Sequence, residues 1–130
     1  MKPDPHLLLA VSGHGYGHLA QCAPVINALW QRLPRLRLTV CSRLERGVIA
    51  DRLALPFDYR CRSVDPVLPM HSAWQVDVPA ARSVFTGFYR ERAAGLEEDL
   101  AVLVELRPHL LLANIPWRLL QAARQAGARE

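Results

Sequence analysis

The stretch from His6 to Leu19 constrains the fold of this chain more than any other feature. An apolar run, His6-Leu7-Leu8-Leu9-Ala10-Val11, leads into the turn Ser12-Gly13-His14-Gly15-Tyr16-Gly17-His18, and an amphipathic segment begins at Leu19. A buried strand, a glycine-rich turn and a helix, in this order, build ligand sites at the carboxyl ends of strands in α/β sheets. Glycine allows the sharp turn, and the free N–H groups of the helix N-terminus point at it. We therefore expect an α/β domain with a ligand site at this turn.

The rest of the chain alternates between strand-like and helix-like segments. Apolar residues at three- and four-residue steps predict helices over 19–33, 44–53, 80–107 and 117–126. Apolar or β-branched runs predict further strands over 36–41, 57–61 and 109–113. This alternation favours a Rossmann-like parallel sheet in the order 3-2-1-4 with helices on both faces. Trp30, Val84, Phe85 and Phe88 are expected in the core, and Gly87 and Gly95 are expected to kink the long helix.

The end of the sequence suggests an incomplete domain. Ala126-Gly127-Ala128 is typical of a helix C-cap before a fifth strand, yet the sequence ends at Glu130. We therefore expect residues 1–130 to form a single domain, truncated after the fourth strand and its helix. Its fourth strand would keep an open apolar edge, which favours self-association.

Composition excludes several classes of protein. The formal net charge is +4 with dispersed arginines, so nucleic-acid binding has little support. The apolar runs are too short to span a bilayer, and the N-terminus lacks a secretory signal pattern, which predicts a cytoplasmic protein. The three cysteines, Cys22, Cys41 and Cys61, lack metal-ligand spacing and are expected to be buried thiols, with no metal site.

A dinucleotide-binding domain is an alternative interpretation of the same turn. The residues from Gly15 to Ala20 satisfy the pattern Gly-x-Gly-x-x-(Gly/Ala) after a strand. However, the second predicted strand ends in Cys41-Ser42-Arg43, without the acidic residue that would hold the ribose of NAD. Arg43 would instead suit a 2′-phosphate, so this alternative predicts NADP. A third hypothesis is a non-catalytic remnant that self-associates through its open edge.

The chain also resembles a known family of enzymes. Its turn, the Gly17-His18 pair followed by Pro24, and the later turn Asn114-Ile115-Pro116-Trp117 resemble the N-terminal, acceptor-side domain of GT-B glycosyltransferases. The similarity is to the UDP-glycosyltransferase and MurG types, although Pro24 lies further along than in the MurG pattern. The turn is also similar to the N-terminal region of L-arabinokinase-like proteins.

This resemblance implies a glycosyltransferase that moves a sugar from a nucleotide-sugar, expected to be a UDP-sugar, to a small-molecule or glycan acceptor. His18 would be the general base, and Gly15 and Gly17 would bring N–H groups near the donor phosphates. The remaining candidates for substrate contact are His14, the exposed-looking His71 and Trp74 of the long loop 63–79, and Asn114. Each has a structural alternative: loop shaping for His14, a mobile surface for His71 and Trp74, and turn capping for Asn114. Because the donor-binding domain is missing, the chain is not expected to be active alone or to hold a cofactor tightly.

Overall fold

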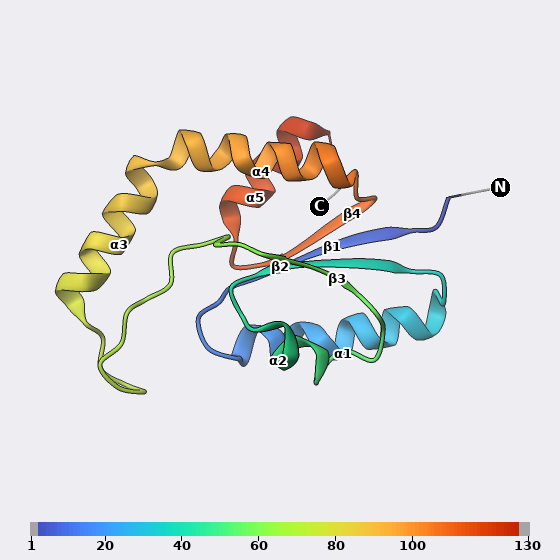
Figure 1. The fold of residues 1–130 in the computed structure, drawn as a ribbon, viewed down its shortest axis with the longest axis horizontal. Helices are drawn as coiled ribbons and strands as arrows, with labels where there is room; N and C mark the ends of the chain where they lie inside the picture. The colour runs from blue at the N-terminus through green and yellow to red at the C-terminus, as the bar shows by residue number, and fades with distance from the viewer. Residues whose placement is uncertain (1–2, 128–130) are drawn as a thin grey trace.

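The protein is an α/β sandwich built on one parallel sheet, as the computed structural model shows for residues 3–127 (Figure 1). The four strands run in the order β3-β2-β1-β4, which confirms the predicted order 3-2-1-4. The expected C-cap is described only as far as Gly127, whose φ of 70° is left-handed; Ala128 and Glu130 lie outside the described residues. The elements are β1 (His6–Val11), α1 (Gly17–Arg32), β2 (Arg37–Ser42), α2 (Arg46–Ala50), β3 (Asp58–Cys61), α3 (Val78–Arg90), α4 (Arg92–Leu106), β4 (Leu110–Asn114) and α5 (Trp117–Ala126).

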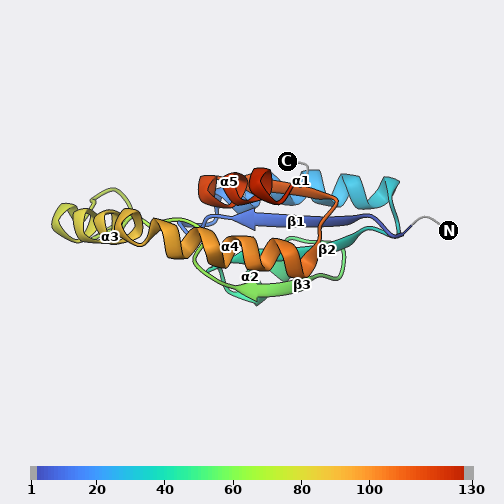
Figure 2. The ribbon, with the colours of Figure 1, turned by 90° about the horizontal axis from the view of Figure 1, so that it is seen from above.

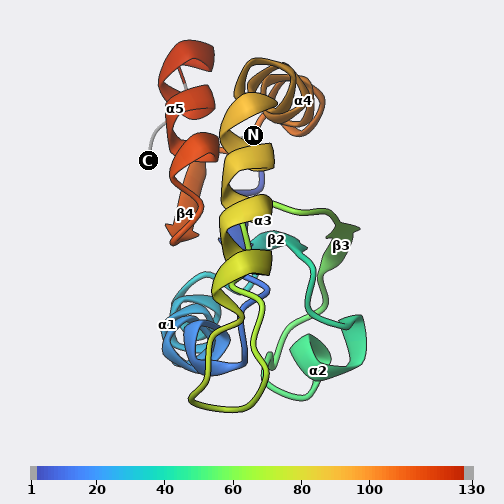
Figure 3. The ribbon, with the colours of Figure 1, turned by 90° about the vertical axis from the view of Figure 1, so that its left-hand side faces the viewer.

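Alternate side chains of β1 point into two separate cores, one on each face of the sheet. Leu7, Leu9 and Val11 pack with α1 and α2, whereas Leu8 and Ala10 pack with α4 and α5. Figure 3 shows this three-layer arrangement end-on. Every residue of β1 is buried, as expected of a central parallel strand covered on both faces. β1 pairs in parallel with β2 and with β4, so the turn after β1 lies between the carboxyl ends of its two neighbours.

The imidazole of His6 anchors the amino end of β1. Its Nε2 lies 2.9 Å from the Thr39 hydroxyl and its Nδ1 lies 3.2 Å from the Leu106 carbonyl oxygen. Burial, followed by the positive charge of Arg37, lowers the pKa of His6. The backbone N–H of His6 donates to Nδ1 of His109, so both histidines have structural partners.

The prediction of one long helix over residues 80–107 is wrong. The chain forms α3 and α4 with a break at Glu91, which lies between the two glycines expected to kink the helix. α3 extends beyond the carboxyl ends of the strands, away from the sheet (Figure 2). Each residue of α3 stays at least partly exposed, so Val84, Phe85 and Phe88 do not belong to the buried core that was expected. Sequence periodicity alone identifies an amphipathic helix but not what lies beneath it.

Two smaller expectations also need correction. Cys22 and Cys41 are buried thiols, and burial raises the pKa of Cys41 to about 11, but Cys61 is exposed. α1 begins at Gly17 rather than Leu19, and Pro24 lies in the helix interior. Because Pro24 has no N–H, it cannot donate to the carbonyl oxygen of Ala20 one turn earlier. Ala20 is exposed, so water can donate to this oxygen instead. Trp30 packs partly buried against the core on the α1 face.

Candidate active site

The glycine-rich turn joins β1 to α1 at the carboxyl edge of the sheet, and two of its glycines have distinct physical roles. Gly15 has a φ of 66°, in the left-handed region that favours glycine. A Cβ on Gly13 would come within 2.9 Å of the Cβ of Arg43, so Gly13 allows the turn to approach the end of β2 closely. Gly17, the first residue of α1, has open space around it. The turn is therefore shaped by Gly13 and Gly15.

His18 and Asn114 meet at this edge, although 96 positions separate them in the sequence. Nδ1 of His18 lies 2.9 Å from Oδ1 of Asn114. The Asn114 amide nitrogen donates to other groups of α1: Oε1 of Gln21 at 3.0 Å, Sγ of Cys22 at 3.4 Å and the backbone carbonyl oxygen of His18 at 3.5 Å. Because the amide oxygen faces the imidazole, neutral His18 donates from Nδ1 and keeps its lone pair on Nε2. The structure thus brings together two of the residues selected from the sequence.

A buried aspartate that the sequence analysis did not select lies beside the turn. Asp65, on the loop after β3, is 3% exposed, and its Oδ2 accepts a 2.6 Å hydrogen bond from the hydroxyl of Ser12. Its Oδ1 is buried with no hydrogen-bond partner among residues 3–127. Burial raises the pKa of Asp65, while the Ser12 hydrogen bond and the nearby His18 and His14 imidazoles act in the lowering direction. A buried aspartate in a long loop has no periodic signal that could identify it.

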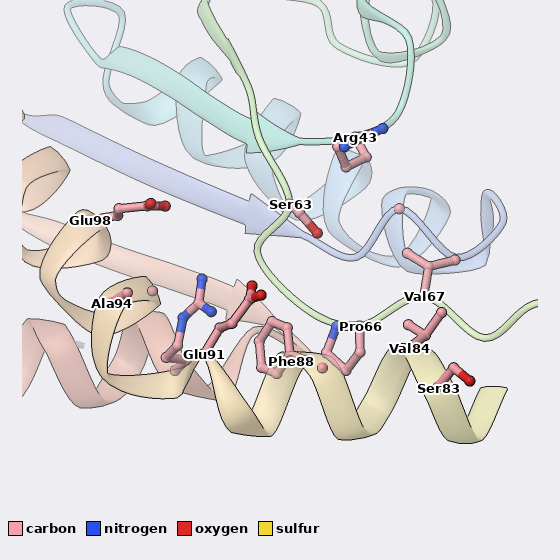
Figure 4. A pocket seen from close by; sticks show the side chains of 14 residues that line it. Arg43, Ser63, Pro66, Val67, Ser83, Val84, Phe88, Glu91, Ala94 and Glu98 are labelled. Carbon is pink, nitrogen blue, oxygen red and sulfur yellow. The ribbon is translucent and has the colours of Figure 1, made fainter. Parts of the chain in front are cut away.

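An open cavity of about 840 Å³ lies beside the turn, between the loop after β3 and the α3–α4 pair. Figure 4 shows Arg43, Ser63 and Val67 on one side and the helix residues Val84, Phe88 and Glu91 on the other. Gly13 belongs to both the turn and the cavity lining. Among the described residues, the lining includes none of the candidates chosen from the sequence: His14, Gly15, Gly17, His18, His71, Trp74 and Asn114.

The inner wall of the cavity depends on a buried ion cluster. Arg118 of α5 donates from Nε to Oδ2 of Asp99 on α4 at 2.6 Å, and Arg62 donates to Oδ1 of Asp99 at 2.5 Å. The guanidinium of Arg118 also lies over the ring of Phe88, 4.5 Å from its centroid. Gly95 leaves the space that this guanidinium occupies. The cluster therefore ties α4, α5 and the segment after β3 together behind the cavity.

The turn that carries His71 and Trp74 makes its contacts within its own segment, and not with His18. They belong to a tight turn closed by an antiparallel bridge between Met70 and Val76, in which the His71 amide donates to the Gln75 carbonyl at 2.7 Å. Trp74 is 86% exposed, and Nε2 of His71 lies 3.7 Å from Oδ2 of Asp77. The long loop is thus exposed at its far end, as expected, but ordered by its own contacts.

Three further properties bear on the candidate functions. Within residues 3–127, no group of three or more His, Cys, Asp or Glu side chains is placed to hold a metal ion. The helices in the same range are too short or too polar to cross a bilayer. β2 ends at Ser42, and the exposed Arg43 that follows it lines the cavity.

The comparisons with known proteins point to one fold. No protein-family model matches the sequence, and no curated protein matches it. A UDP-glycosyltransferase from Siraitia grosvenorii, solved in complex with UDP, matches 95% of this chain with a TM-score of 0.55 at 19% identity. The chain has the fold of one part of a UDP-glycosyltransferase. UGT2 of Phytolacca americana, complexed with UDP-2fluoro-glucose and pterostilbene, matches 98% of it with a TM-score of 0.56 at 18% identity. The chain spans 26% and 30% of the lengths of these two proteins.

Proposed function

We propose that this chain is the acceptor-side part of a glycosyltransferase that transfers a sugar from a UDP-sugar to an acceptor hydroxyl. The observation that carries the proposal is the fold, which two UDP-glycosyltransferases share over 95% and 98% of the chain. One of those structures holds UDP, and the other holds a UDP-sugar analogue with pterostilbene. A donor-binding domain outside this chain would supply the nucleotide-sugar.

His18 is the general base of the proposed reaction. Its Nδ1–H is held by Asn114, so the Nε2 lone pair is available to take the proton of the acceptor hydroxyl. The acceptor oxygen then forms a bond to C1 of the sugar, and the bond from C1 to the phosphate oxygen breaks as UDP leaves with its electron pair. Asn114 acts by orienting the imidazole, a role that the third member of a catalytic triad also performs.

The cavity beside the turn is the proposed binding site for the acceptor. Val67, Val84 and Phe88 give it apolar walls, and Gly13 places it next to the turn that carries His18. A cavity of this size suits a small, largely apolar molecule with hydroxyl groups. Pterostilbene, which is bound in the Phytolacca complex, is therefore a suitable probe.

Titration of the ¹⁵N-labelled chain with pterostilbene, UDP and NADP tests this assignment. We expect pterostilbene to shift the amide signals of Gly13, Val67 and Phe88. Saturable NADP binding with shifts around Arg43 would contradict the proposal and support the dinucleotide alternative.

His18→Ala tests the chemistry in a protein that joins this chain to a donor-binding domain. Loss of a general base is expected to lower kcat by about 100-fold to 10,000-fold. His71→Ala is the matched control, because His71 is exposed and its contacts are with Gln75 and Asp77 of its own segment rather than with Asn114. A His18→Ala enzyme with nearly the wild-type rate would eliminate this role for His18.

A further inference from the structure

Ser12 connects three segments that meet at the proposed active site. Its hydroxyl donates to Oδ2 of Asp65 at 2.6 Å and accepts the backbone N–H of His14 at 3.2 Å. The backbone N–H of Ser12 donates to the carbonyl oxygen of Asn114 at 3.3 Å. The side chain of the same Asn114 holds His18. Asp65 is therefore linked to the imidazole of His18 through two residues.

We propose that Asp65 is a positioning residue, which holds Ser12 so that the glycine-rich turn and Asn114 present His18 in one orientation and one tautomer. This inference rests on the proposed function, since it assigns Asp65 a role in the work of His18. The hydroxyl of Ser12 has one hydrogen to donate. By accepting it, the Asp65 carboxyl leaves the lone pairs of that hydroxyl facing the His14 amide. The orientation of the turn thus follows from the acceptor at position 65.

The environment of Asp65 favours this role over simple core filling. Val64, its neighbour, belongs to the apolar core on the α5 face, and an apolar side chain at position 65 would avoid burying a carboxyl. Instead the carboxyl is 3% exposed and has one oxygen without a partner among the described residues. Leaving a buried oxygen unpaired costs free energy. The hydrogen bond from Ser12 is a contact that an apolar side chain at position 65 could not make.

The experiment compares Asp65→Leu with Asp65→Asn in the ¹⁵N-labelled chain. Leucine is close in size but accepts no hydrogen bond, whereas asparagine keeps an acceptor oxygen. In Asp65→Leu we expect hydrogen exchange at the His14 amide to rise roughly tenfold, the equivalent of one lost hydrogen bond. We also expect the imidazole nitrogen signals of His18 to move from the Nδ1–H tautomer toward a mixture. Asp65→Asn should restore both properties.

Asp51→Asn, at an exposed aspartate in the loop after α2, is the control and should change neither property. If Asp65→Leu does not fold, Ser12→Ala replaces it, because this substitution removes the hydroxyl that joins Asp65 to the His14 amide. A folded variant with an unchanged His18 tautomer would overturn the proposal, even if the His14 amide exchanged faster. Both measurements are independent of sugar transfer, so they separate failure of this inference from failure of the proposed function, which the His18→Ala kinetics decide.

Discussion

Two buried aspartates near the cavity differ in the partners of their carboxyl oxygens. Asp99 is 0% exposed, and two guanidinium groups, those of Arg62 and Arg118, bind its two oxygens. Asp65 is 3% exposed, receives one hydroxyl hydrogen bond and keeps one oxygen unpaired among the described residues. The negative charge of Asp99 is thus compensated, and its pair with Arg118 joins α4 to α5. Asp65 instead has no guanidinium partner among the described residues, and it lies near His14 and His18. Asp99 therefore belongs to a structural ion cluster, whereas Asp65 is a candidate for a functional role.

Asp99→Ala should produce the largest effect, because it leaves the buried guanidinium of Arg118 without its anion. Removing one partner of a buried ion pair costs about 3–5 kcal/mol. Unfolding of the chain in urea should show this loss. Glu105→Ala is the matched control: Glu105 pairs with Arg60 at the surface, where both side chains are exposed, and about 1 kcal/mol or less is expected. Equal effects of the two substitutions would mean that the Asp99 cluster is not structural.

Gly95→Ala should have an intermediate effect through the same cluster. A Cβ at this position would overlap the guanidinium of Arg118 and push it away from Asp99. We expect a loss of about 1–3 kcal/mol in the free energy of unfolding, typical of overpacking. Gly87→Ala, on α3 with open space around it, should instead stabilise its helix by up to about 1 kcal/mol. A stabilising Gly95→Ala would show that Arg118 is free to move.

Asp65→Asn should change how the free energy of unfolding depends on pH, with a smaller effect on the free energy of unfolding itself. Because burial raises the pKa of Asp65 above its usual 3.8, the folded state binds the proton more tightly than the unfolded state. Stability from this group is therefore fully present below pH 3.8 and is lost as pH rises through the raised pKa. In Asp65→Asn this decline should disappear, and unfolding in urea between pH 3.5 and 7 measures it, with Asp51→Asn as the control. An identical pH profile in Asp65→Asn would show that Asp65 titrates normally.

Local patterns were sufficient for most of the architecture. The apolar run ending at Val11 identified the central strand β1, because a strand covered on both faces has no polar side. The run beginning near Leu110 identified β4, which lies at the edge of the sheet and is only partly buried. The glycine-rich turn identified the edge of the sheet that holds the candidate site. His18 was selected from this turn, and Asn114 was selected from the end of the last strand. The division of the predicted long helix at Glu91 was missed, since apolar residues recur at three- and four-residue steps on both sides of it.

The candidate site was predictable only in part. Asp65 and the cavity were missed because neither has a local pattern: Asp65 stands alone in a proline-containing loop, and the cavity joins loop, helix and turn residues from distant positions. His71 and Trp74 were chosen for their exposed-looking loop, but the contacts of His71 are with Gln75 and Asp77 of its own segment, and not with the His18–Asn114 pair. The sequence can indicate that a loop is exposed, but whether its side chains reach the candidate site depends on the path of the loop in the folded protein.

The sequence by itself determined the parallel sheet, its strand order and the turn at its carboxyl edge, because strand periodicity, glycine placement and crossover rules act over short distances along the chain. The tertiary structure alone decided which polar groups meet at that edge. Ser12 and Asp65 are 53 positions apart, and His18 and Asn114 are 96 apart. Such contacts depend on how both faces of the sheet pack, and burial at this edge raises the pKa of Asp65.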